Sequence, residues 1–429
     1  MQTPEASDPD WLTRGRGHVW LPYAQMKTAG APLPAARTRG SRIILEDGRE
    51  LVDGIASWWT ACHGYNHPHI AEAVRAQLER MPHVMFGGLA HEQAYRLAAR
   101  LAALLPGDLD HVFFTESGSV SVEVAIKMAL QYWMNRGETG RRKLVAFRGA
   151  YHGDTFATMA VCDPAEGMHA LFAGALADHV IADLPRDAAS LARLRDTIAA
   201  RRHELAAIIV EPLVQGAGGM LFHDAETLRR LRALADEFGL LLIFDEIFTG
   251  FGRTGTMFAS EAAGVVPDIV TLSKALTGGT LPLAATIARR HVFDAFWSDN
   301  PAHALMHGPT YMGNALACAA ANASLDLFER EPRLDQVARI SGMLAEGLAP
   351  CRALPGVADA RTLGAIGVVE FETAPDRRAL QQRLVARGVW ARPFGKIAYL
   401  TPAFTIGDDD LGRLTGALVA AIGDIARTG

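Results

Sequence analysis

Lys274 is the side chain in this sequence that best fits nucleophilic amine chemistry. It ends the apolar run DIVTLSK (268–274), and the small residues of ALTGG follow it. A lysine partly removed from water loses some of its preference for the charged form, which makes it a better nucleophile for Schiff-base formation. Only five of the 42 basic residues are lysines, and the other four are expected on an amphipathic helix, in a basic surface run or in loops (Lys127, Lys143, Lys27 and Lys396).

Asp245 closes the most apolar run of the chain, LLLIFDE (240–246). A carboxylate at the rim of a dry core needs a partner. One interpretation is a counter-charge for a cationic ring nitrogen. The other is structural, either a helix cap or an ion pair with an arginine such as Arg253, and Asp245 alone does not decide between the two.

Gly118 and Ser119 lie where the run HVFF (111–114) gives way to a helical pattern. The backbone N–H groups and the dipole of a helix N-terminus, with a serine hydroxyl added, suit a phosphate group. Simple N-capping by Ser117 or Ser119 is the structural alternative. The two roles are compatible.

Short apolar runs alternate with helical stretches from residue 111 onward, which predicts the elements that position these residues. This alternation predicts an α/β fold with a mostly parallel central sheet flanked by helices, because parallel strands need crossover connections. The runs are 111–114, 143–147, 207–212, 240–246 and 268–274, and helical patterns cover 119–133, 225–238 and 313–330. Ligands collect at the carboxyl ends of such strands. There the sequence places Glu116, Tyr151, His152, Asp154, Glu211, Asp245 and Lys274.

The flanking segments predict further elements. Residues 1–17 are expected to be a loose tail, and 42–53 a hairpin that turns at Asp47-Gly48. A helix over 68–81 would bury a stripe of Ile70, Val74 and Leu78, and another helix is expected over 91–105. Residues 358–425 carry a second, smaller α+β pattern.

Three further patterns have a structural as well as a functional interpretation. Gly250, Gly252 and Gly255 match a dinucleotide-binding motif but lack its strand, turn and helix order. The histidines of 63–69 and 303–307 have no cysteine or carboxylate at ligand spacing, so we expect no metal. Trp58-Trp59 suits either core filling or an aromatic pocket wall.

Composition limits the function classes. With 429 residues, two packed domains are expected, and a net charge of −5 without a basic, aromatic stripe disfavours nucleic-acid binding. The acidic start lacks the apolar segment of a secretory signal, and no apolar run is long enough for a membrane helix. The four cysteines are far apart and form no CxxC pair, which predicts free thiols and a cytoplasmic location.

A phosphate site, a carboxylate at one strand end and a partly buried lysine at another describe an enzyme that uses pyridoxal 5'-phosphate. At these positions the chain resembles the class III aminotransferases of fold type I. The shared motifs are GSVSVEVAIK (118–127), YHGDT (151–155), EPLVQGAGG (211–219), FDEIFTGFGRTG (244–255) and LSKALTGG (272–279). The resemblance implies a large cofactor-binding domain (65–328) and a small α+β domain built from an N-terminal segment (1–64) and a C-terminal one (329–429).

Further stretches resemble one subfamily. They are VWLPYAQM (19–26), SWWTACHGYNHP (57–68), HVMFGGLAHE (83–92), HGPTYMGNALACAAANASL (307–325) and GVWARPFGKIAYLTP (388–402). Its members transfer the amino group of S-adenosyl-L-methionine to 8-amino-7-oxononanoate, giving 7,8-diaminononanoate for biotin biosynthesis. The resemblance implies this reaction and a homodimer with shared active sites.

The resemblance also assigns roles to individual positions. Lys274 would hold the cofactor and move the proton, Asp245 would pair with the ring nitrogen and Tyr151 would stack on the ring. The phosphate would be held by Gly118 and Ser119, and by Pro309 and Thr310 of the neighbouring subunit. The substrate site would comprise Tyr23, Trp58, Trp59, Tyr151, Asp154, Arg253, Lys274, Gly308, Arg392 and Tyr399, with Arg392 as the candidate for a carboxylate.

Three alternatives remain at this stage. One is another class III aminotransferase, acting on ornithine, 4-aminobutyrate or a diamine. The second is the same acceptor with lysine as the amino donor. The third is a cofactor-binding protein without turnover, which an intact Lys274 and Asp245 argue against.

Overall fold

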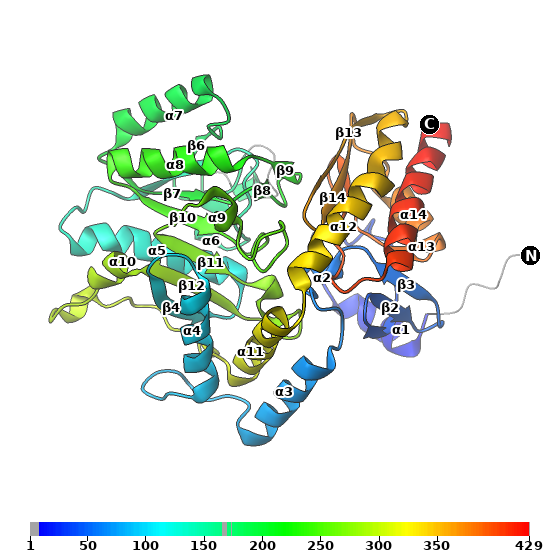
Figure 1. The fold of residues 1–429 in the computed structure, drawn as a ribbon, viewed down its shortest axis with the longest axis horizontal. Helices are drawn as coiled ribbons and strands as arrows, with labels where there is room; N and C mark the ends of the chain where they lie inside the picture. Colours follow the sequence, from blue (N-terminus) through cyan, green and yellow to red (C-terminus); the bar gives the residue numbers. More distant parts are fainter. Residues whose placement is uncertain (1–7, 165–169, 173, 429) are drawn as a thin grey trace, which may run out of the picture.

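A seven-stranded sheet forms the centre of the larger body (Figure 1). The structure is a computed structural model and describes residues 8–164, 170–172 and 174–428. Across the sheet the strands are β4 (Leu109–Thr115), β12 (Ala284–Arg289), β11 (Ile269–Leu272), β10 (Leu241–Asp245), β7 (Leu205–Val210), β5 (Lys143–Phe147) and β6 (Val180–Ala182). Strand β12 runs antiparallel to both of its neighbours, β4 and β11, and the other strand pairs of this sheet are parallel. The expected mostly parallel sheet is therefore confirmed, although the sequence did not predict β6 or β12.

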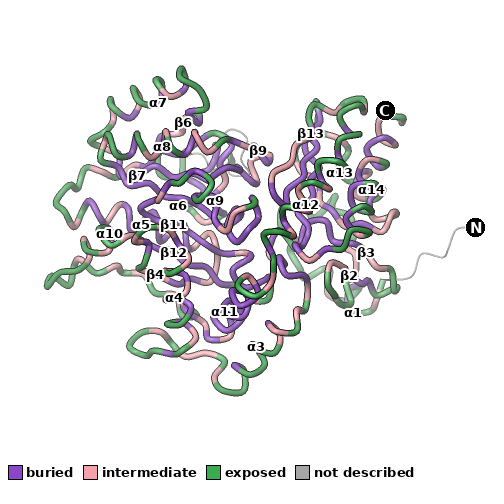
Figure 2. Tube along the Cα trace, in the orientation of Figure 1, coloured by how far each residue is buried: buried purple, intermediate pink, exposed green. Residues whose placement is uncertain are grey.

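Helices cover both faces of this sheet, and the strands are buried between them (Figure 2). Alternate residues of one strand face opposite cores: Ile209 and Ile243 pack with α5, whereas Ile208 and Leu242 belong to the core on the other side. This is why the strands lack a polar face. The helices of this body are α3 (Pro68–Arg80), α4 (Glu92–Leu104), α5 (Gly118–Asn135), α6 (Phe156–Ala160), α7 (Ala188–Arg201), α8 (Ala225–Phe238), α9 (Ala259–Ala263), α10 (Arg290–Asp294) and α11 (Ala315–Arg330).

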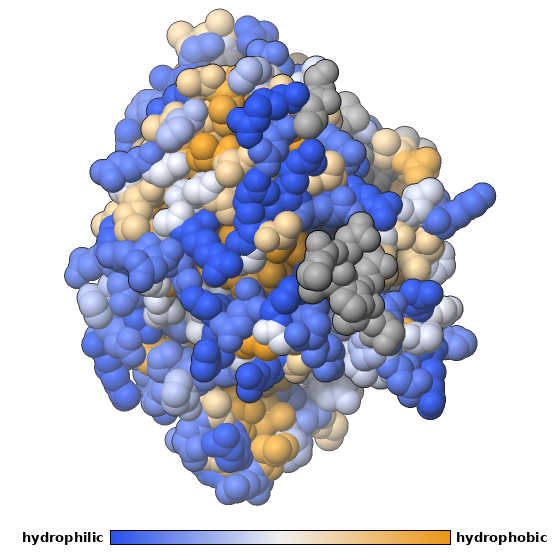
Figure 3. Space-filling view, turned by 90° about the vertical axis from the view of Figure 1, so that its right-hand side faces the viewer, coloured by the Kyte–Doolittle hydropathy of each residue, from blue (hydrophilic) through white to orange (hydrophobic). Residues whose placement is uncertain are grey.

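The smaller body joins the two ends of the chain. Strand β15 (Val389–Trp390) pairs in parallel with β3 (Glu50–Asp53), beside β2 (Arg42–Leu45) and β1 (Ala35–Arg39). A second sheet consists of β13 (Val357–Leu363), β14 (Ile366–Phe371) and β16 (Ile397–Leu400), and the helices are α1 (Asp10–Gly15), α2 (Ala56–Trp59), α12 (Arg333–Leu348), α13 (Arg377–Ala386) and α14 (Asp408–Thr428). Its outer face is largely hydrophilic, with separate hydrophobic patches (Figure 3). The expected α+β body of N- and C-terminal segments is confirmed, and we keep the boundaries at 64/65 and 328/329 as our proposal.

Several local predictions hold and two are wrong. The hairpin β2–β3 turns at Gly48, whose φ is 84°, and α3, α4, α5, α8 and α11 lie where helical patterns predict them. The tail prediction is wrong for residues 10–17, which are helical, while residues 1–7 lie outside the described part. Leu78 is 55% exposed, because residues spaced by four drift around a helix of 3.6 residues per turn.

A short two-stranded sheet, β8 (Val214–Gln215) and β9 (Leu221–Phe222), lies in the connection after β7. Within the described residues, no helix combines the length and the apolar character needed to span a membrane.

Candidate active site

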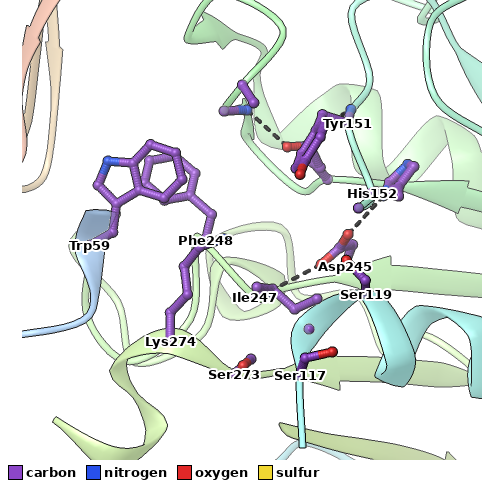
Figure 4. Close-up of a pocket in the computed structure, with 15 residues that line it drawn as sticks. Trp59, Ser117, Ser119, Tyr151, His152, Asp245, Ile247, Phe248, Ser273 and Lys274 are labelled. Carbon is purple, nitrogen blue, oxygen red and sulfur yellow. Dashed lines mark hydrogen bonds and ion pairs between the residues drawn. The ribbon is translucent and has the colours of Figure 1, made fainter. Parts of the chain in front are cut away.

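A cavity of about 210 Å³ opens where the parallel strands end, as the strand order requires (Figure 4). Its lining comes from segments that are distant in sequence. The lining residues are Trp59, Ser117, Gly118, Ser119, Tyr151, His152, Gly153, Glu211, Gly216, Ala217, Asp245, Ile247, Phe248, Ser273 and Lys274. The structure therefore brings together six of the predicted site residues: Lys274, Asp245, Tyr151, Gly118, Ser119 and Trp59.

Lys274 lies two residues after the end of β11, at the start of a short 3-10 helix, and has a left-handed backbone (φ 47°). Its side chain extends toward Trp59 and Phe248, and its Nζ lies 4.9 Å from the centroid of the Trp59 ring (Figure 4). Burial lowers the pKa of Lys274, although Asp245, Glu211 and Asp154 act in the opposite direction. The amine therefore loses its proton more readily than a surface lysine would.

Asp245 is almost fully buried at the end of β10. Its Oδ2 accepts a hydrogen bond from His152 Nδ1 at 2.7 Å, and its Oδ1 accepts from Ile247 N and Thr271 Oγ1, both at 3.2 Å. Burial opposes protonation of His152, but the hydrogen bond and charge of Asp245 outweigh it and raise the pKa of His152. The hydrogen bond from His152 thus orients the carboxylate, and the alternative of an ion pair with Arg253 is wrong, because Arg253 binds the carbonyls of Ala365 and Pro402 instead.

Glu211 is a buried acid that had no predicted role. Its two oxygens accept from the backbone N–H groups of Tyr151 (2.9 Å) and Gly216 (2.8 Å). Burial raises the pKa of Glu211 to about 7. Its position after a strand singled it out in the sequence, as it did His152, but strand-end position alone does not show which groups meet.

The first turn of α5 has both a serine N-cap and an open space suited to a phosphate. Ser117 caps the helix by accepting from Val120 N at 3.3 Å, while Ser119 Oγ accepts from Asp154 N at 3.2 Å. A Cβ at Gly153 would lie 2.3 Å from Ser119 Oγ, and one at Gly118 would lie 3.1 Å from the Ile247 side chain. Only glycines leave this space open beside the unpaired N–H groups of a helix N-terminus.

The cavity fits pyridoxal phosphate on these observations. An amine that deprotonates readily, a fixed carboxylate and a glycine-lined helix N-terminus match the aldehyde, the ring nitrogen and the phosphate of that cofactor. Lys274, Asp245 and the pair Gly118 and Ser119 would hold these three groups.

Polar and aromatic side chains form a second group beside the cavity. Tyr23 donates to Asp154 Oδ2 at 2.5 Å, Tyr151 donates to Asp154 Oδ1 at 2.9 Å, and the two tyrosine oxygens lie 3.4 Å apart. The Arg392 guanidinium lies 4.8 Å from the ring centroid of Trp58 and 5.8 Å from that of Tyr23. Within the described part of the chain, no carboxylate forms an ion pair with Arg392, so this cation is free to receive one.

Trp59 is packed between aromatic rings and the lysine. Its ring centroid lies 4.4 Å from that of Phe248 and 6.1 Å from that of Tyr399. Phe248 was not among the predicted site residues. It lies in the turn after Asp245, and nothing in the local sequence indicates that its ring contacts Trp59.

Four predicted residues belong neither to the cavity lining nor to the side chains described beside it. Arg253 is buried between the two bodies, where it donates from Nη1 to the carbonyls of Ala365 and Pro402, and burial lowers its pKa to about 10. Gly308, Pro309 and Thr310 lie in the segment before α11, where Thr310 O accepts from His83 Nε2 at 3.0 Å. Their predicted roles remain proposals.

The histidines and glycines set aside above take structural positions. His63 Nδ1 accepts from Arg333 Nε at 2.9 Å and its Nε2 lies 3.0 Å from Ser324 Oγ. The described residues contain no group of three or more histidine, cysteine, aspartate or glutamate side chains arranged to hold a metal ion. Residues 250–255 form turns and do not open a helix.

Comparisons with known proteins agree with this geometry. The sequence profile of the aminotransferase class-III family matches residues 23–422. The adenosylmethionine-8-amino-7-oxononanoate aminotransferase of Mycobacterium leprae is 45% identical over 95% of each chain. The crystal structure of the enzyme of that name from Methanocaldococcus jannaschii superposes with a TM-score of 0.93 at 31% identity, covering 96% of this chain and 98% of that one. A PLP-bound amine transaminase from an uncultivated Pseudomonas species gives 0.89 at 33% identity, covering 96% and 99%.

Proposed function

The chain belongs to the class III aminotransferases, and we propose that it transfers the amino group of S-adenosyl-L-methionine to 8-amino-7-oxononanoate. The products are 7,8-diaminononanoate, an intermediate of biotin biosynthesis, and the 2-oxo acid of the donor. The enzyme depends on pyridoxal 5'-phosphate, as its family does.

One observation carries the proposal. The half-buried Lys274, whose amine has a lowered pKa because of desolvation, and the buried carboxylate of Asp245 line one cavity together with the first turn of α5. A desolvated amine or a buried carboxylate destabilises the fold unless it has a partner, and a helix N-terminus alone is a common feature. The presence of all three groups in one cavity supports a binding site for a molecule that carries an aldehyde, a cationic ring and a phosphate.

Different residues of this chain have different roles in the proposed reaction. Bound pyridoxal phosphate supplies an electron-accepting ring that stabilises negative charge on the carbon beside the transferred amine. Asp245 would pair with the ring nitrogen of the cofactor, and His152 orients that carboxylate through a hydrogen bond of 2.7 Å. The Lys274 amine takes the proton from the amine-bearing carbon of the donor and returns one to the carbonyl carbon of the acceptor, a transfer favoured by its lowered pKa.

Arg392 is our proposed site for a substrate carboxylate. It is held over the rings of Trp58 and Tyr23, so its planar face is packed while its N–H groups remain for a bidentate partner. Tyr23, Trp58, Asp154 and the other residues beside the cavity would surround the two substrates in turn. We propose for Arg253 and Tyr399 a supporting place in the same site.

We also propose a homodimer in which each subunit completes the other's phosphate site. Hydrogen bonds join the segments at 83–92 and 304–313, and each segment exposes a large apolar side chain, Met85 (62% exposed) in the first and Met306 (80%) in the second. Exposed apolar side chains of this size favour burial against another protein surface. Gly308, Pro309 and Thr310 lie in this region and would reach the partner's cavity, since they do not line their own.

We propose a cytoplasmic location. All four cysteines are free and buried, which suits a reducing compartment.

The proposal is tested by product analysis. Purified enzyme loaded with pyridoxal phosphate is incubated with 8-amino-7-oxononanoate and either S-adenosyl-L-methionine or lysine, and 7,8-diaminononanoate is measured by mass spectrometry. Product with the first donor and not the second supports the proposal. If 7,8-diaminononanoate forms with lysine and not with S-adenosyl-L-methionine, the proposed acceptor is correct and the proposed donor is wrong. If it forms with neither donor, the proposal is contradicted.

A further inference from the structure

Residues 56–59 form a turn of left-handed helix, although none of them is glycine. Their φ angles are 44°, 47°, 56° and 71°. The turn closes like a helix, because Trp59 N donates to Ile55 O at 2.8 Å and Thr60 N donates to Ala56 O at 2.9 Å. L-amino acids adopt this conformation rarely and at a cost, so four in succession require something that holds them.

The turn sends its two indoles to different parts of the site. Trp58 contacts the substrate side, where its ring lies 6.1 Å from that of Tyr23 and under the guanidinium of Arg392. Trp59 contacts the cofactor side, 4.9 Å from Lys274 Nζ. A right-handed turn of the same residues would point both side chains elsewhere.

Asp53 is the group that holds this turn. Its carboxylate is 1% exposed at the end of β3. Oδ1 accepts from Ile55 N at 2.9 Å, and Oδ2 accepts from Ser57 N at 3.0 Å and from the Tyr65 hydroxyl at 2.5 Å. The Tyr65 oxygen also lies 2.5 Å from Ser57 Oγ, so the acid and the phenol bind the turn at three points.

We propose that Asp53 is a positioning residue for the aminotransferase reaction, acting with Tyr65 to keep residues 56–59 left-handed and both indoles in place. The inference rests on the proposed function of the site. Asp53 lines no part of the cavity, and Lys274 and Asp245 lie on other elements. Loss of the Asp53 carboxylate should therefore displace the two indoles and reduce substrate use, whereas Lys274, which lies on another element, keeps its amine for attaching the cofactor.

The test compares Asp53→Asn with Asp47→Asn, the same change in the β2–β3 turn of the same sheet, where the side chain is partly exposed. We expect kcat/KM for the amino acceptor to fall about tenfold or more in Asp53→Asn, the usual effect of losing a charged hydrogen-bond acceptor, with an unchanged cofactor absorbance band. Asp47→Asn should match the wild type.

A glycine rescue separates positioning from general stability. Glycine adopts positive φ without the Cβ penalty, so Asp53→Asn with Ala56→Gly should recover part of the lost kcat/KM, by about threefold or more. If Asp53 only stabilised the folded protein, the added glycine would increase the entropy of the unfolded chain and lower activity further. Should Asp53→Asn fail to fold, Tyr65→Phe decides: reduced kcat/KM with an intact absorbance band supports the proposal.

Wild-type kcat/KM in Asp53→Asn, or no rescue by glycine, would overturn the inference while the proposed function stands. A wild-type enzyme that does not use the proposed substrates would instead contradict the function, and the variants are then compared with whichever primary amine the wild type consumes.

Discussion

Acid should destabilise this protein through His63, and replacing that residue should remove part of the effect. His63 is buried beside Cys62, and its Nδ1 accepts from Arg333 Nε at 2.9 Å. Burial, together with the charges of Arg333 and His67, lowers the pKa of His63 to about 3 from 6.5. His63 therefore stays neutral in the folded protein at pH values where the unfolded chain protonates it.

The sign and the size of the pH effect on the free energy of unfolding follow from the difference between the pKa of His63 in the folded and the unfolded state. The unfolded state binds more protons below pH 6.5, so the free energy of unfolding falls as the pH falls, and the loss continues down to about pH 3. Between pH 7 and pH 5 this one group removes about 2 kcal/mol, at about 1.4 kcal/mol per pH unit below 6.5.

The assay is chemical unfolding at pH 7, 6 and 5 of the wild type, of His63→Gln and of the control His203→Gln, an exposed histidine. At pH 7 the His63 variant is less stable than the wild type, because the bond to Arg333 is weakened. That gap should narrow by about 2 kcal/mol by pH 5, whereas the gap of the control should stay constant. A gap in the His63 variant that does not change with pH would refute the reasoning.

Three further substitutions address the site. Lys274→Ala should abolish the borohydride-reducible attachment of the cofactor; survival of that adduct on another lysine, seen by peptide mass mapping, would contradict the assignment. Arg392→Ala should raise KM for the oxo acid about tenfold or more, the value of a charge-assisted pair, and leave cofactor affinity unchanged; equal losses of both would mean a structural role. Gly153→Ala should weaken cofactor binding, measured by equilibrium dialysis, because its Cβ would lie 2.3 Å from Ser119 Oγ at a φ of 131°; unchanged affinity would show that this space is not needed.

The sequence predicted the chemistry of the site better than its contacts. Apolar runs that end in Asp245 and Lys274 are local features, so their place at the carboxyl edge of a parallel sheet followed from the alternation of elements. The bond between His152 and Asp245 joins residues 93 apart. It depends on which strands are neighbours, and no local pattern contains that order.

Other misses have specific physical reasons. The strand β12 (Ala284–Arg289) is rich in alanine and gives little β signal, although it is fully buried except at its end. The left-handed turn at 56–59 contains no glycine, so its sequence gives no sign of positive φ. Its cause, Asp53 with Tyr65, becomes visible only when β3 and the segment after the turn are folded together.

The most direct test of the central claim is one half-reaction followed by absorbance. S-adenosyl-L-methionine is added to the pyridoxal phosphate enzyme without an acceptor, and 8-amino-7-oxononanoate is added afterwards. The account predicts that the first addition converts the bound cofactor to its pyridoxamine form and that the second reverses the change. No change with S-adenosyl-L-methionine, but conversion by lysine or another amine, would contradict the proposed donor while leaving Lys274 and the fold as described.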